Sequence, residues 1–232
     1  MLNPFATVTN YGEMLAKIAA FTFFAGLLCV IYIQNSVPSL GVLFASTFSI
    51  DVAGVAVSWK TLVPALVLGL LSRVAKLHVL LDRLLGIRKS FAIRHILLPL
   101  ALGSGASLTR SQVRSMMERG NLMNEVFYRY ASSSEGKAQI DPHLIVKALD
   151  QWCWFWIVLE SLLVALLASF VLFLYGSLRS AFWFMLAALV LVGLLRALLR
   201  LCSQYAWEQV DAILSDGPRR DEVAKVFNAI QA

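Results

Sequence analysis

The sequence predicts an all-α integral membrane protein with four transmembrane helices, N-in and C-in, a small outer β-hairpin and a helical cytosolic domain. Of the 232 residues, 59% are hydrophobic and 15% are charged, a balance typical of multi-span membrane proteins. Two long apolar stretches, residues 154–174 and 182–201, follow each other across a short turn, and each is long enough to span a bilayer. Basic residues are also distributed very unequally along the chain, which indicates how the spans are oriented.

The first span is predicted over residues 18–33, after Glu13 and Lys17 and before Pro38. The segment that precedes it lacks the basic start and the small-residue cleavage site of a secretory signal peptide. We therefore expect this stretch to be retained as a membrane helix.

The second span is less regular. Residues 62–71 are apolar and uncharged but too short to cross a bilayer alone, and Arg73 and Lys76 follow at once. An alternative places the span over residues 52–71 with Lys60 at its middle, at a cost of roughly a few kcal/mol for the buried charge.

The loop between these spans, residues 37–59, predicts an outer β-hairpin. Apolar residues alternate on both sides of a turn at residues 51–54: Val42, Phe44, Phe48 and Ile50 before it, and Val55, Val57 and Trp59 after it.

The distribution of Lys and Arg predicts the topology. Eighteen basic residues lie in the N-terminal segment, in residues 72–151 and in the tail that begins at Arg196, whereas only Lys60 and Arg179 lie on the other side. Basic residues are enriched in cytoplasmic segments of membrane proteins. We therefore expect the chain to cross a bacterial inner membrane four times, with both termini in the cytosol.

The sequence predicts that the chain divides into four parts. Residues 1–82 hold the first two spans with the outer hairpin, 83–151 form a cytosolic helical segment, 152–202 form the membrane hairpin, and 203–232 form a cytosolic helical tail. Asp141 and Pro142 are a helix-starting pair, and no helix breaker follows until Gly176, which predicts one long helix that contains the third span.

Each of the last two spans contains one ionisable residue. Glu160 lies 18 residues before Leu178 and Arg196 lies 18 residues after it, so an antiparallel hairpin with its tip at Leu178 places both at the same depth. We predict an intramembrane ion pair between them; snorkelling without pairing and a role in conduction are the alternatives.

Arg73, Lys76 and Arg83 share one face of the second helix if it continues unbroken to about Leu85. This basic inner face would form a positive vestibule around an oligomer axis or a site for anionic lipid headgroups. The alternative is the ordinary basic flank of a short span.

Small residues recur at four-residue spacing in three spans and predict close helix packing, within one subunit or between subunits. They are Thr22 and Gly26; Ser161, Ala165 and Ser169; and Gly193 and Ala197.

No pattern in the chain predicts a cofactor, a metal site or catalytic residues. The three cysteines and three histidines are scattered, without the spacing of zinc ligands. The basic residues are explained by topology, so we expect no direct nucleic-acid partner.

The architecture as a whole resembles the small four-span membrane components of bacterial anti-phage defence systems. It resembles flagellar stator subunits less well, because the third span lacks their Pro/Gly/Thr-rich pattern. The first resemblance implies an oligomeric pore-like effector with a cytosolic sensing or docking part.

Two functions therefore compete. One is a non-enzymatic, homo-oligomeric channel or pore-type subunit or effector controlled by its cytosolic domain, with the lipid bilayer, anionic lipids and a cytosolic protein as partners. The other is a non-conducting scaffold or assembly subunit of an envelope, secretion or conjugation complex that docks a cytosolic partner. A membrane enzyme fits least, because no clustered His, Asp or Glu lies in the spans.

Overall fold

The computed structural model describes residues 6–44, 49–52, 55–106, 108–119, 121–132 and 138–231. The chain divides into two compact units. The first, here called the apolar unit, comprises residues 12–80 and 153–198, and the second, the polar unit, comprises residues 1–11, 81–152 and 199–232. The polar unit holds 25 of the 34 charged residues of the chain.

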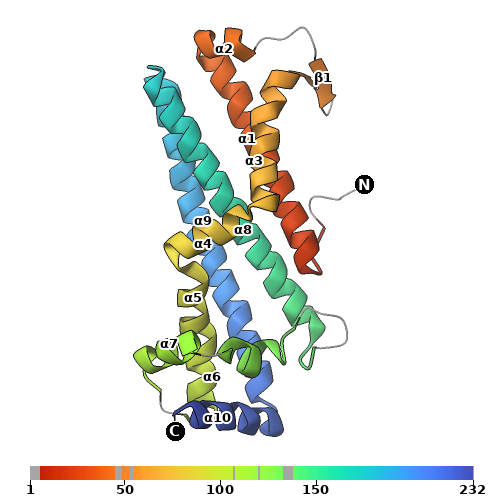
Figure 1. The fold of residues 1–232 in the computed structure, drawn as a ribbon, viewed down its shortest axis with the longest axis vertical. Helices are drawn as coiled ribbons and strands as arrows, with labels where there is room; N and C mark the ends of the chain where they lie inside the picture. Colours follow the sequence, from red (N-terminus) through yellow and green to blue (C-terminus); the bar gives the residue numbers. More distant parts are fainter. Residues whose placement is uncertain are drawn as a thin grey trace. The chain divides into compact units, whose positions relative to one another are not determined.

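Three helices in the described part of the chain are long and apolar enough to cross a membrane: α1 (Tyr11–Ser36), α8 (Pro142–Leu174) and α9 (Leu178–Leu214). Helices α3 (Trp59–Val74) and α4 (Leu77–Leu85) are long and apolar enough to cross a membrane only when taken together, and the chain bends by 67° where they meet. The described residues therefore contain three candidate spans, or four if the bent pair is one span (Figure 1).

Helix α8 begins where its capping residues predict. Asp141 Oδ1 accepts a hydrogen bond of 2.9 Å from the backbone N–H of His143, and Pro142 is the first helical residue. The predicted single long helix is confirmed, since α8 runs without interruption to Leu174.

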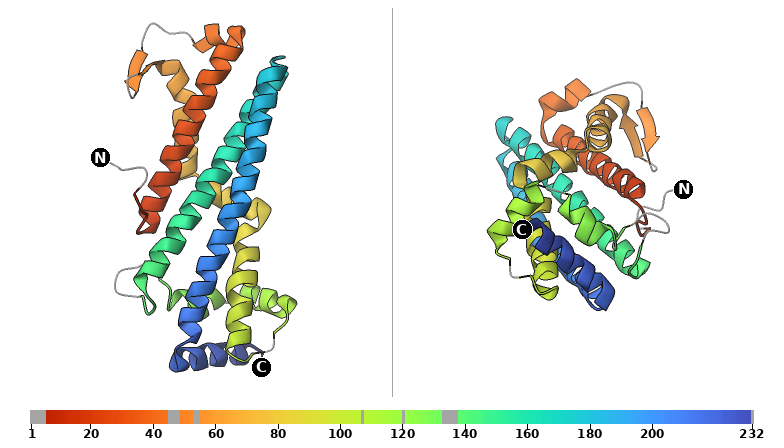
Figure 2. Two further views of the ribbon diagram at one scale, coloured as in Figure 1. Left: turned by 180° about the vertical axis from the view of Figure 1, so that it is seen from behind. Right: turned by 60° about the horizontal axis from the view of Figure 1, so that its bottom comes forward.

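Helices α8 and α9 form an antiparallel hairpin that turns at Gly176, which has a φ of +76° and thus a conformation that favours glycine. Near the turn, Ser169 Oγ donates a hydrogen bond of 3.0 Å to the Ala181 carbonyl oxygen. Figure 2 shows the two helices side by side.

The predicted β-hairpin is confirmed in a shorter form. Strands β1 (Ser49–Val52) and β2 (Val55–Ser58) pair antiparallel, with Ser49 opposite Ser58. The extended conformation predicted for Val42 and Phe44 is wrong, because both lie in a short helix, α2 (Pro38–Phe44), whose first residue is a helix-starting proline. Residues 45–48, with Phe48, and the turn residues 53–54 lie outside the described part.

Helix α3 packs closely on α1. A Cβ atom added at Gly26 would lie 2.8 Å from Leu68 Cδ1, and one added at Gly69 would lie 2.9 Å from Phe23 Cβ, so both glycines allow the backbones to approach. Lys60 lies in the first turn of α3 and is exposed. The alternative span with Lys60 at its middle is therefore wrong.

The helix breaks between α3 and α4 at Lys76, which has a φ of +49°. A left-handed conformation costs about 1–2 kcal/mol in a residue with a Cβ, so surrounding contacts have to stabilise the bend. The condition of one unbroken helix to about Leu85, on which the basic inner face depended, is therefore not met.

The polar unit is built from shorter helices. After a left-handed Gly86, α5 (Ile87–Ala92), the π-helical segment η1 (Ile93–Leu97) and α6 (Leu98–Gly103) follow directly on one another. Helix α7 (Arg110–Arg119), the π-helical segment η2 (Asn124–Tyr128), α10 (Gly217–Gln231) and the adjoining ends of α8 and α9 complete the unit. Its core is apolar and includes Leu97, Leu100, Val113, Phe127, Ile213 and Phe227, each at most 4% exposed.

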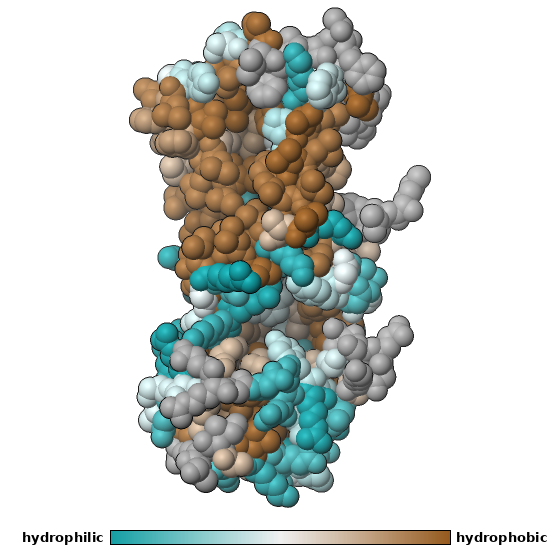
Figure 3. Space-filling view, viewed as in Figure 1, coloured by the Kyte–Doolittle hydropathy of each residue, from teal (hydrophilic) through white to brown (hydrophobic). Residues whose placement is uncertain are grey.

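On the face that Figure 3 shows, apolar side chains cover most of the apolar unit. They include Leu66 and Leu70 on α3 and Leu189 and Val190 on α9, each more than half exposed. Such a surface suits contact with lipid or with another membrane helix.

Candidate functional site

The candidate site is a cluster of polar side chains around Glu160, inside the apolar unit. Glu160 lies on α8 and is 0% exposed, and the three polar residues nearest to it come from three other helices. They are Thr22 on α1, Ser72 on α3 and His78 on α4, each at most 1% exposed.

One oxygen of the Glu160 carboxylate accepts two hydrogen bonds. Thr22 Oγ1 and Ser72 Oγ each donate to Glu160 Oε2 at 2.6 Å. Both distances lie within the ordinary range for a hydroxyl that donates to an oxygen, so one carboxylate oxygen joins α8 to α1 and to α3.

The other oxygen of Glu160 faces the imidazole of His78. His78 Nδ1 lies 3.7 Å from Glu160 Oε1, and Oε1 has no hydrogen-bond partner among the described residues. Trp156, one turn before Glu160, is 1% exposed, and its ring centroid lies 5.8 Å from that of His78. The pair is therefore closed off from solvent within this unit.

This geometry connects the two sides of the α3–α4 break. Ser72 lies in the last turn of α3 and His78 in the first turn of α4, and both contact the same carboxylate. Because an isolated charge in an apolar interior is costly, displacing either contact changes the free energy of the cluster. The cluster thus links α4 to α1, α3 and α8.

The structure does not bring Glu160 and Arg196 together. Arg196 is exposed on α9, whereas Glu160 is fully buried against α1, α3 and α4. The predicted ion pair is not among those formed by the described residues, so that prediction is wrong. Equal depth in a hairpin does not fix the direction in which a side chain points, because each helix can rotate about its own axis.

The basic inner face is also rearranged. Arg73, Lys76 and Arg83 are all exposed, but they lie on α3, at the break and on α4, respectively. The bend at Lys76 removes the continuous helical face on which the prediction depended.

The small residues separate into a buried group and an exposed group. Thr22 and Gly26 are buried where α1 meets its neighbours, and Ala165 and Ser169 are at most 7% exposed on α8. Ser161 is half-buried, whereas Gly193 and Ala197 are exposed on α9. A Cβ added at Gly193 would meet nothing within 4 Å.

Burial shifts the pKa of some titratable groups in the polar unit. Burial, with the nearby charge of Arg94, lowers the pKa of His95 below its ordinary value of 6.5. Burial raises the pKa of Tyr130, whose hydroxyl donates a hydrogen bond of 2.9 Å to Glu222 Oε2. No group of three or more His, Cys, Asp or Glu side chains in the described segments could hold a metal ion.

Sequence reasoning missed two members of the cluster, Ser72 and His78. Both were visible as polar residues close to the end of the second apolar stretch, six positions apart. Thr22 was predicted to mediate packing only, and its hydrogen bond to Glu160 adds a second role.

The fold and the cluster define the protein as a largely helical membrane protein whose candidate spans are joined by a buried carboxylate. The chain belongs to the YmfE protein family, whose model matches residues 10–229. No curated protein and no solved structure matches the chain.

Proposed function

We propose that this protein is a non-enzymatic, homo-oligomeric channel- or pore-type subunit or effector of the bacterial inner membrane, controlled by its cytosolic part. The observation that carries the proposal is the Glu160 cluster, which contacts both sides of the break between α3 and α4. The chain continues from α4 into the polar unit, so α4 is one route, beside α8 and α9, by which a cytosolic event would reach the spans.

The arrangement of α3 supports this proposal. One face of α3 packs on α1 through Ala65 and Gly69, while Leu66 and Leu70 are exposed and Arg73 follows at the end of the helix. Copies of α3 around an axis would give an apolar constriction with a ring of positive charge at one mouth, a combination that gates by dewetting and favours anions. The setting of phage defence rests on the architectural resemblance alone.

The second candidate is a non-conducting scaffold that recruits a cytosolic partner. The exposed surfaces of α3 and α9 favour it, because they are apolar over several turns and provide no polar lining for a water-filled path. A membrane scaffold needs such surfaces only for lipid and for neighbouring helices.

The test is to purify the protein, measure its mass, image single particles and record currents in planar bilayers. The channel proposal expects a ring with an axial opening and stepwise conductance. Glu160→Gln, which removes the charge and keeps the shape, is expected to change the opening frequency without dissociating the ring.

Ser169→Ala is the matched control, because it removes a buried hydrogen bond from the same helix at a point remote from the cluster. It is expected to conduct like the unmodified protein. If the unmodified protein and the Glu160→Gln variant both assemble but neither conducts, the channel proposal is rejected and the scaffold proposal remains.

A further inference from the structure

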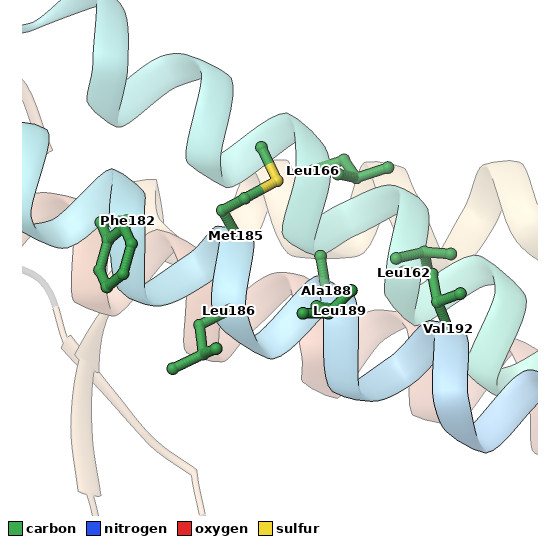
Figure 4. A pocket seen from close by; sticks show the side chains of 8 residues that line it. All are labelled: Leu162, Leu166, Phe182, Met185, Leu186, Ala188, Leu189 and Val192. Carbon is green, nitrogen blue, oxygen red and sulfur yellow. The ribbon is translucent and has the colours of Figure 1, made fainter.

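A shallow apolar groove runs along the outside of the α8–α9 hairpin, within the apolar unit. Its volume is about 330 Å³, close to the lower limit of small-molecule sites. Two leucines of α8 and six residues of α9 line it (Figure 4). They are Leu162, Leu166, Phe182, Met185, Leu186, Ala188, Leu189 and Val192.

One end of this groove carries an exposed positive charge. Arg196 lies one helical turn beyond Val192, and residues four positions apart share a helix face. Gly193 lies between them, and the space beside it is open. The apolar groove thus ends one helical turn from an exposed arginine, beside open space at Gly193.

From this juxtaposition we infer that the groove and Arg196 form a binding site for an anionic phospholipid. One acyl chain lies along the groove and the phosphate contacts the Arg196 guanidinium, which binds phosphate in a bidentate manner. This inference goes beyond the proposed function and is independent of whether the protein conducts.

Charge favours a lipid over a second copy of α9 as the occupant. All copies of a membrane protein insert with the same orientation, so a symmetric α9–α9 contact would place two Arg196 side chains at the same depth. Like charges at such a contact repel each other, whereas a lipid phosphate neutralises the guanidinium.

The test measures lipids that remain bound after reconstitution in vesicles of phosphatidylglycerol and phosphatidylethanolamine and extraction in mild detergent. Native mass spectrometry counts both lipids on each chain. The unmodified protein is expected to retain phosphatidylglycerol preferentially, and Arg196→Gln to reduce this retention about five-fold, the effect of one basic residue near a membrane surface.

Leu189→Trp fills the groove at a position that is 67% exposed and therefore tolerates a larger side chain. It is expected to reduce retention as well. The matched controls are Lys60→Gln, which removes one exposed positive charge, and Leu66→Trp, which enlarges one exposed leucine, both on α3. Both controls are expected to retain the lipid like the unmodified protein.

Three results would overturn the inference. In the first, Arg196→Gln retains phosphatidylglycerol at the unmodified level. In the second, Arg179→Gln, at the other end of the groove, abolishes retention while Arg196→Gln does not. In the third, Leu189→Cys cross-links efficiently to a second copy, which would mean that another chain occupies the groove.

Discussion

Helices α8 and α9 are the two arms of one hairpin, and they differ far more in the structure than in the sequence. Each contains a long apolar stretch with a single ionisable residue, at equal distances from Leu178. In α8, 44% of the most apolar 18-residue stretch is buried within the chain, whereas in α9 only 6% is. Glu160 is accordingly enclosed, while Arg196 is exposed.

The difference follows from the chemistry of the two side chains. A glutamate is too short to carry its charge from the span to the membrane surface, so its carboxylate has to be satisfied by neighbouring helices. An arginine has a long apolar stem and can extend its charged end towards the headgroups. Equal depth therefore leads to opposite environments.

The largest expected effect is a difference in thiol labelling between the two ends of α9, which tests whether this helix crosses the membrane. In a variant that lacks the three native cysteines, Arg179→Cys and Ser215→Cys place one thiol near each end of α9. An impermeant thiol reagent added to intact spheroplasts is expected to label residue 179 and to leave residue 215 unlabelled until the membrane is opened. Labelling of both positions before the membrane is opened would contradict the predicted topology.

The next effect compares the two ionisable residues directly. Glu160→Ala leaves the hydroxyls of Thr22 and Ser72 without their buried acceptor, and we expect it to lower the free energy of unfolding by about 3–5 kcal/mol. Arg196→Ala, at an exposed position, is expected to change it by less than about 0.5 kcal/mol. Denaturation in mixed detergent measures both, and equal losses would contradict the assigned burial.

A double-mutant cycle separates the hydrogen bonds from general packing. Ser72→Ala removes one hydroxyl that donates to a charged group, and the expected loss is about 1.5–3 kcal/mol. This loss is expected to disappear in a Glu160→Ala background, because the acceptor is already absent. A Glu160–Arg196 cycle run in the same way is expected to show no coupling.

Two glycines provide a smaller contrast between buried and exposed helix faces. Gly69→Ala places a Cβ 2.9 Å from Phe23 Cβ and 3.4 Å from the Ala19 carbonyl oxygen, so a loss of about 1–3 kcal/mol is expected. Gly193→Ala meets nothing within 4 Å and is expected to stabilise α9 by about 0.5–1 kcal/mol. Thermal unfolding of both variants checks this, and a destabilised Gly193→Ala variant would mean that another helix packs closely on this face of α9.

The smallest effect extends the contrast between buried and exposed groups to titration. Because the folded state lowers the pKa of His95, the unfolded chain binds a proton more readily, and stability is expected to fall as the pH drops below 6.5. His95→Gln should weaken this dependence slightly. The unfolding temperature, measured above and below that pH for both proteins, is the readout; an unchanged dependence would assign the acid sensitivity to other groups.

The sequence by itself determined the long apolar helices, the start of α8 and a β-hairpin. These features depend on local signals: runs of apolar residues, the Asp141–Pro142 helix start and alternation on both sides of a turn. Hydrophobic length and capping act within a few residues along the chain, so they can be read without knowing what the helix touches.

Only the tertiary structure decided which side chains meet. The sequence paired Glu160 with Arg196 because both lie at one depth, but the rotation of α8 about its axis directs the carboxylate to Thr22, Ser72 and His78. That rotation is set by the packing of α8 on other helices, an interaction between residues up to 138 positions apart. The bend at Lys76 is likewise a tertiary result, because a lysine enters the left-handed region only where contacts on both sides offset the cost.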